Sequence, residues 1–165
     1  MSIRILTTGG TIDKVYFDAT SEFEVGEPTA GLILKDSRVT VDYEVTPLMR
    51  KDSLELTDED RAVIAKAATE ASESCILITH GTDTMTDTAA VLLAAGIVEL
   101  GKTVVITGAL NPARFRSTDA IFNVGMATAA VQGLDPGVYI TMNGQVFPGD
   151  KVRKNREKMA FELID

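Results

Sequence analysis

The sequence has few of the residues that form disulfides and metal centres. Its 165 residues include one cysteine, Cys75, one histidine, His80, and no tryptophan. One cysteine cannot form an intrachain disulfide, and a structural zinc site usually takes four cysteine or histidine ligands. We therefore expect neither of these, and no metal or other cofactor. The acidic residues leave a carboxylate-bound magnesium open as the alternative.

Long apolar runs and an excess of positive charge are also missing. No stretch approaches the roughly 20 apolar residues that span a bilayer, and the chain starts with a strand-like run at 3–6 instead of an apolar signal segment. Acidic residues outnumber basic ones by 24 to 16, which argues against nucleic acid and against an anionic membrane surface as partners. We expect a cytoplasmic protein that acts on a small molecule.

The stretch that organises the chain lies at residues 75–88, CILITHGTDTMTDT. A short apolar run of strand length ends in a glycine turn, and helix formers follow. Open α/β sheets bind their ligands at the carboxyl ends of strands, near the free N–H groups of a helix N-terminus. The turn therefore predicts a ligand site. The alternative is that Asp83, Thr84 and Asp87 only cap the next helix.

A second junction of this kind lies at the start of the chain. The strand at 3–6 runs into TTGGTIDK, where paired glycines allow positive φ and close approach of a ligand to the backbone. Thr11 follows with its hydroxyl available. A phosphate-binding loop is the alternative, but neither the GxxxxGK[ST] nor the GxGxxG pattern is present.

Strands and helices alternate along the chain. We expect strands at 3–6, 39–48, 75–79, 103–107 and 138–142, and helices at 57–72, 85–99 and 118–132. Thr57 and Asp60 form a capping-box pattern at the start of the first helix. Because parallel neighbours need the crossover connections that helices supply, we predict an α/β fold in one domain. Its sheet should be three-layer, mostly parallel and doubly wound, of the flavodoxin-like or Rossmann-like kind.

Two segments lie outside this alternation. Residues 15–31 mix aromatic residues, acids, glycine and proline without a period, which predicts a mobile loop that serves as a lid. Its Tyr16 lies close enough to Thr11 in sequence to relay a proton from the threonine hydroxyl. Residues 143–165 include five basic residues between Lys151 and Lys158. They are interpreted either as a solvated edge or as a cationic patch that holds an anionic substrate or tunes a nearby acid.

Hydroxyl groups follow three of the predicted strands. Thr11, Ser53 and Thr82 lie where a parallel sheet brings strand ends to a single edge, and Asp83 follows the last of them. A threonine hydroxyl is a poor nucleophile until a neighbouring group takes its proton, so Asp83 with a lysine would be a suitable activating pair. Ser-His-Asp chemistry is disfavoured because the chain has no G-x-S-x-G elbow. The pattern favours a nucleophilic hydrolase.

Four segments resemble the bacterial-type L-asparaginases, a family that includes glutaminase-asparaginases. They are TGGTI at 8–12, DSLELTDED at 52–60, HGTDTM at 80–85 and VVITGALNP at 104–112. The resemblance extends over essentially the whole chain but corresponds to the first domain of the usual two-domain enzyme. It implies an N-terminal-type catalytic domain at 1–165 without the usual C-terminal domain. We expect a homo-oligomer, either a dimer or a tetramer, to cover the exposed surface.

The resemblance also implies roles for individual residues. Thr11 would be the nucleophile that forms an acyl-enzyme and releases ammonia, and a second cluster would be completed by a lysine, for which Lys154 fits and Lys151 lies close. Ser53 and Asp83 would hold the carboxylate and amino groups of the substrate. The expected catalytic residues are Thr11, Tyr16, Thr82, Asp83 and Lys154, and the expected substrate-binding residues are Gly10, Asp52, Ser53, Gly81, Thr82 and Asp83.

One departure from the family concerns the lid. In longer members the lid tyrosine lies in a segment that resembles residues 21–26, where this chain has Phe23, so we take Tyr16 as the substitute. The expected reaction is hydrolysis of the side-chain amide of L-asparagine. A glutaminase-asparaginase or another small-amide hydrolase is the enzymatic alternative. A module that binds asparagine or aspartate without turnover, or a structural assembly subunit, would be a non-enzymatic one.

Overall fold

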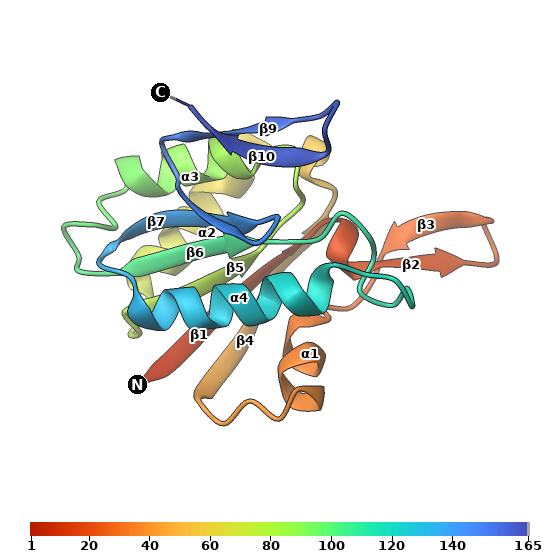
Figure 1. The fold of residues 1–165 in the computed structure, drawn as a ribbon, viewed down its shortest axis with the longest axis horizontal. Helices are drawn as coiled ribbons and strands as arrows, with labels where there is room; N and C mark the ends of the chain where they lie inside the picture. Colours follow the sequence, from red (N-terminus) through yellow and green to blue (C-terminus); the bar gives the residue numbers. More distant parts are fainter. Residues whose placement is uncertain (165) are drawn as a thin grey trace.

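A six-stranded sheet forms the centre of the molecule. The computed structural model describes residues 1–164, so the expected domain at 1–165 reaches one residue beyond the described range. The sheet has the order β4-β1-β5-β6-β7-β8 (Figure 1). Its strands are β1 (Ser2–Gly9), β4 (Asp42–Lys51), β5 (Cys75–Thr79), β6 (Thr103–Thr107), β7 (Gly137–Met142) and β8 (Gln145–Pro148).

The strand pairing confirms the predicted α/β class. The first five strands pair in parallel, and β8 closes the far edge antiparallel to β7. Numbered along the chain, the parallel strands lie in the flavodoxin-like order 2-1-3-4-5. This order reverses direction between β1 and β5, and ligands of such sheets bind in the crevice at that reversal.

Helices cover both faces of the sheet. They are α1 (Ala30–Asp36), α2 (Asp58–Glu70), α3 (Met85–Ala94) and α4 (Ala120–Gly133). Because successive side chains of a strand point to opposite faces, Ile76 and Ile78 join one core cluster with α2 and α3, whereas Leu77 joins the other with α1 and α4 (Figure 1). The three layers are therefore as predicted. None of the helices described within residues 1–164 has the length and apolar content to cross a membrane.

The predicted start of the helix at 57–72 is confirmed at its first turn. The Thr57 hydroxyl accepts a hydrogen bond from the Asp60 backbone N–H, and the Asp60 carboxylate accepts one from the Thr57 N–H. The reciprocal pair satisfies two N–H groups that have no partner inside the helix.

The prediction of a loop at 15–31 was wrong. The segment folds into an antiparallel hairpin of β2 (Lys14–Phe17) and β3 (Glu22–Val25), which projects from the body of the molecule, and then enters α1 (Figure 1). Tyr16 is paired with Phe23 across the hairpin, and the two rings meet edge to face at 5.5 Å. Aromatic cross-strand pairs stabilise such ribbons. The acids and glycines around these residues conceal that pairing in the sequence.

Three further segments differ from the prediction. The helix predicted to reach residue 99 ends at Ala94, because Gly96 adopts φ +80 and turns the chain out of the helix. The strand predicted at 39–48 runs to Lys51 through Pro47, which an edge strand accommodates because one side of it needs no N–H donors. The basic segment after β8 forms a second hairpin, β9 (Val152–Asn155) and β10 (Ala160–Leu163).

Candidate active site

Two glycine turns touch at the reversal of strand order. Gly10 follows β1 and Gly81 follows β5, and a Cβ atom built on Gly10 would lie 2.4 Å from the Gly81 nitrogen. Gly10 also has φ +87, a conformation that residues with a Cβ rarely adopt. Only glycine lets these two backbones come so close. Because Thr11 and Thr82 are the next residues in the chain, this contact sets the two threonines beside the same crevice.

A third turn packs against the same point. The short helix η2 (Ser53–Glu55) follows β4, and a Cβ on Gly81 would lie 2.6 Å from that of Ser53. Ser53 is 2% exposed, and its hydroxyl oxygen accepts a hydrogen bond of 3.2 Å from the Asp83 N–H. The Thr84 hydroxyl donates to the Ser53 carbonyl oxygen at 2.9 Å. The predicted meeting of three strand ends is therefore observed.

Thr11 lies just beyond the end of β1. Thr11 opens the short helix η1 (Thr11–Asp13) and is partly exposed. Within residues 1–164, its hydroxyl makes no side-chain hydrogen bond. An exposed hydroxyl without a competing partner suits attack on a carbonyl carbon once a base takes its proton.

Lys154 connects the β9–β10 hairpin to the turn after β5. Its ammonium group donates hydrogen bonds of 2.7 Å to the Thr82 hydroxyl and 2.8 Å to the Asp83 carboxylate. Lys151, the neighbouring alternative, is exposed at the turn before β9. The structure thus brings together Thr82, Asp83 and Lys154, and their catalytic roles stay predictions.

The polar side chains that follow β5 contact residues outside α3. Thr84 is the N-cap residue of α3, but it makes no side-chain capping hydrogen bond. The Asp83 carboxylate pairs with Lys154, and the Thr84 hydroxyl bonds Ser53. Simple helix capping therefore does not account for either side chain.

No hydrogen bond joins Tyr16 to Thr11 within residues 1–164. It lies on β2 with its ring against Phe23, which in turn packs on Phe115 at 5.7 Å. In the described part of the chain, residues 1–164, no side-chain hydrogen bond is formed by the Tyr16 hydroxyl. The proton relay from Thr11 through Tyr16 stays a prediction.

Asp52 has its carboxylate engaged by protein groups. It caps η2 in a reciprocal capping box with Glu55 and forms a 2.8 Å ion pair with Lys14. The hydrogen bond from Lys14 holds the pKa of Asp52 below its usual value. In this structure Asp52 fastens the base of the β2–β3 hairpin to η2, and the part of Lys14 in this link was not predicted.

Sequence reasoning gave His80 no role, although it fixes the turn after β5. It is fully buried, with Nδ1 2.7 Å from the Gly81 carbonyl oxygen and Nε2 2.7 Å from the Thr88 hydroxyl. Since a carbonyl oxygen only accepts, Nδ1 donates and Nε2 accepts from Thr88. Burial lowers the pKa of His80 to about 4, so the ring is neutral at pH 7. Its position next to the glycine turn was the only signal in the sequence.

Asp13 was also missed, and it anchors the short helix of Thr11. Its buried carboxylate accepts hydrogen bonds from the Thr29 N–H and hydroxyl, each at 2.8 Å, and its carbonyl oxygen accepts one from Gly26 at 2.8 Å. Burial raises the pKa of Asp13 above its ordinary value. These bonds hold the end of the β2–β3 hairpin and the start of α1 against η1.

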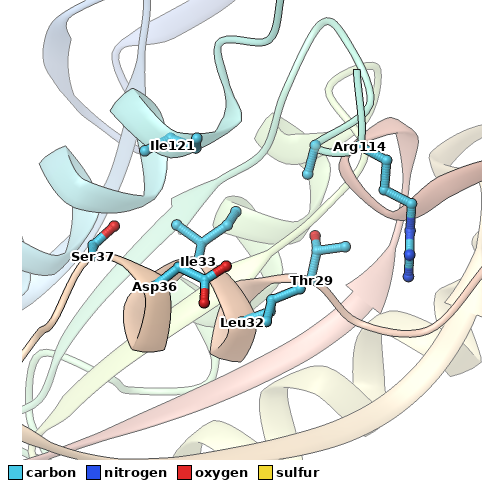
Figure 2. Close-up of a pocket in the computed structure, with 8 residues that line it drawn as sticks. Thr29, Leu32, Ile33, Asp36, Ser37, Arg114 and Ile121 are labelled. Atoms are coloured by element: carbon cyan, nitrogen blue, oxygen red, sulfur yellow. The ribbon is translucent and has the colours of Figure 1, made fainter. Parts of the chain in front are cut away.

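A separate hollow lies between α1 and α4. It has a volume of about 180 Å³, and Figure 2 shows Leu32, Ile33 and Ile121 around it. Its walls are mainly apolar, and none of the predicted site residues lines it. The convergence of strand ends, and not this hollow, identifies the candidate active site. No group of three or more histidine, cysteine, aspartate or glutamate residues within 1–164 is arranged to hold a metal ion.

Comparisons with known proteins point to one family. The family model described as "Asparaginase, N-terminal" matches residues 2–162. L-asparaginase 2 of Escherichia coli is 33% identical over 165 residues, with 93% of this chain and 46% of that protein covered. Glutaminase-asparaginase of Acinetobacter glutaminasificans is 27% identical over 165 residues, with 93% and 49% covered.

A solved structure agrees with these sequence matches. The thermostable L-asparaginase from Thermococcus kodakarensis superposes with a TM-score of 0.85 at 27% identity, covering 99% of this chain and 51% of that one. The chain spans about half the length of the curated relatives it matches.

The contact between the two glycine turns can be tested with Gly10→Ala. The added methyl group meets the Gly81 backbone and a positive φ, so we expect the free energy of unfolding to fall by about 2 kcal/mol. Urea denaturation measures this change. The control is Gly125→Ala in α4, where a Cβ meets nothing within 4 Å, so its stability should be unchanged or higher. Equal stability of the Gly10→Ala and wild-type proteins would contradict the proposed close approach.

The buried histidine predicts a dependence of stability on pH. The pKa of His80 is about 4 in the folded protein and near 6.5 when unfolded, so the unfolded state takes up the proton first as the pH falls. The contribution is fully present above pH 6.5 and is lost between pH 6.5 and 4, by about 3 kcal/mol in total. As the chain has one histidine, its single imidazole C2–H signal in NMR reports the titration directly. A midpoint near 6.5 would show the assignment to be wrong.

Proposed function

Because the chain belongs to the asparaginase family, we propose that it hydrolyses the side-chain amide of L-asparagine to L-aspartate and ammonia. The observation that carries this proposal is the Lys154 ammonium group, hydrogen-bonded to both Thr82 and Asp83 beside the turn of Thr11. A nucleophile, a polar cluster able to move protons, and backbone donors at glycine turns are the parts that acyl transfer needs.

In the first half-reaction, Thr11 Oγ1 attacks the amide carbon. The carbonyl oxygen becomes an oxyanion, which backbone N–H groups around Gly10 and Thr82 stabilise; one such donor can contribute about 3 to 4 kcal/mol. The C–N bond then breaks, and the hydroxyl proton goes with the leaving nitrogen as ammonia. An ester between Thr11 and the aspartyl group remains.

In the second half-reaction, water attacks this ester. The cluster of Thr82, Asp83 and Lys154 accepts a proton from the water, the bond between Thr11 Oγ1 and the acyl carbon breaks, and the proton returns to Thr11. L-aspartate leaves. The opposite division of labour, in which this cluster assists the first attack, is the alternative, and the lysine variant below distinguishes the two.

Ser53 and Asp83 hold the backbone end of the substrate in this proposal. The Ser53 oxygen accepts from the Asp83 N–H, which leaves the hydroxyl proton of Ser53 to donate to a carboxylate. The Asp83 carboxylate suits an ammonium group. Gly10 and Gly81 contribute backbone surface that permits close approach, and Asp52 acts through η2, which it caps.

The β2–β3 hairpin serves as a lid in this scheme. Its closure would carry Tyr16 toward Thr11, where the phenol can relay the proton of the threonine hydroxyl. The ion pair between Lys14 and Asp52 ties the base of the hairpin to η2, so closure would move the tip. We also place the enzyme in the cytoplasm, as a homo-oligomer without a cofactor. A preference for glutamine is the second candidate, supported by the relative named glutaminase-asparaginase.

The role of Thr11 predicts that Thr11→Val loses ammonia release from L-asparagine by at least about 1,000-fold, because the nucleophile is gone. Circular dichroism and thermal unfolding should match those of the wild type. Thr69→Val, on the outer part of α2, is the control and should keep full activity. L-glutamine and D-asparagine are assayed in parallel. Undiminished turnover by Thr11→Val would refute the proposal. Ligand-induced stabilisation of the wild type without ammonia release would instead indicate a binding module.

The role of Lys154 predicts that Lys154→Met lowers kcat by about 100-fold or more, because the hydrogen bonds that order Thr82 and Asp83 are lost. Lys151→Met, which changes an exposed neighbour, should retain wild-type activity. Intact-protein mass spectrometry during turnover then assigns the half-reaction. An aspartyl adduct that accumulates on Lys154→Met places the cluster in deacylation, and its absence places it in the first attack. A kcat equal to that of Lys151→Met would remove Lys154 from the mechanism.

A further inference from the structure

The β9–β10 hairpin places two cationic side chains, Lys154 and Arg156, near the Asp83 carboxylate. Successive side chains of a strand alternate in direction, so Val152 and Lys154 face the domain, whereas Arg153 faces Glu162 on β10. Arg156 follows β9 as the first residue of the turn to β10. Its Nε lies 3.6 Å from the same Asp83 oxygen that Lys154 contacts at 2.8 Å.

Lys154 and Arg156 carry two positive charges, whereas Asp83, the carboxylate that both contact, carries one negative charge. Lys154 is mostly buried and already neutralises Asp83 through a direct hydrogen bond. The Arg156 side chain is 70% exposed and stands farther from Asp83 than Lys154 does, so it is accessible to a ligand. In a chain with a formal charge of −8, the site thus carries a local positive excess. Such an excess attracts an anionic group of a ligand.

The position of Arg156 suits the carboxylate end of the substrate. Asp83 is bordered by Ser53 at its backbone N–H and by Arg156 at its side chain. A guanidinium group matches a carboxylate through two parallel N–H donors, which a lysine cannot reproduce. We propose that Arg156 binds the carboxylate of the substrate and thereby selects amides that carry one. This inference rests on the proposed amidohydrolase function and adds a specificity-determining residue to it.

Three substrates separate recognition of the carboxylate from general support of the site. L-asparagine carries an amino group and a carboxylate, succinamate lacks the amino group, and 3-aminopropanamide lacks the carboxylate. Each releases ammonia when its amide is hydrolysed. Arg156→Gln and Arg156→Lys are compared with Arg153→Gln, which removes a similarly exposed arginine that is paired with Glu162.

We expect Arg156→Gln to raise KM for L-asparagine and succinamate by about tenfold or more, with kcat little changed, and to leave 3-aminopropanamide unaffected. Arg156→Lys should recover part of the loss, and Arg153→Gln should behave as the wild type. An equal loss with all three substrates would show that Arg156 only positions Asp83, and no loss with any would remove it from the site. Either outcome overturns the inference.

Binding of L-aspartate tests the inference independently of turnover. We expect L-aspartate to raise the Tm of the wild type and of Arg153→Gln but not that of Arg156→Gln. If the wild type releases no ammonia from any amide, the proposed function fails, and this difference in Tm would still support carboxylate binding by Arg156. An equal rise in Tm for the wild type and Arg156→Gln would refute it.

Discussion

The contact between Gly10 and Gly81 is the constraint on which the candidate site depends. Parallel neighbours in a sheet lie a fixed distance apart, and a side chain on either turn would separate the two chain segments that leave β1 and β5. Because neither glycine has a side chain, Ser53 can pack against Gly81. Lys154 then reaches Thr82 from a hairpin that is remote in sequence. Buried hydrogen bonds of Asp13 hold the turn after β1, and those of His80 hold the turn after β5.

The sheet was predictable because its signals are local. The β-branched run of β6 indicates a strand buried on both faces, and the reciprocal bonds of Thr57 and Asp60 follow from residues three apart. Strand ends carrying Thr11, Ser53 and Thr82 had to meet once the strands were parallel. The β2–β3 hairpin was missed because its stabilising contact, Tyr16 with Phe23, links residues that no helical or alternating period connects.

The residues at the edge of the site were harder to predict. Lys154 lies in a run of basic residues that, from sequence alone, equally describes a solvated surface, and only the resemblance to a family singled it out. Which of these cations face the domain depends on the two-residue alternation of β9, a strand that the sequence did not indicate. His80 and Asp13 were missed because a buried polar residue is recognised by its partners, and those partners come from other elements.

The late position of the β9–β10 hairpin in the chain has a consequence for biosynthesis. All five parallel strands precede it, and the two core clusters together draw on these strands and on the four helices; the hairpin adds Val152 and Phe161 to the cluster that contains α2 and α3. A nascent chain that has emerged from the ribosome as far as β8 holds every element of the central sheet but not yet Lys154. The scaffold can therefore form during translation before Lys154 joins Thr82 and Asp83, which separates folding of the sheet from assembly of the candidate site.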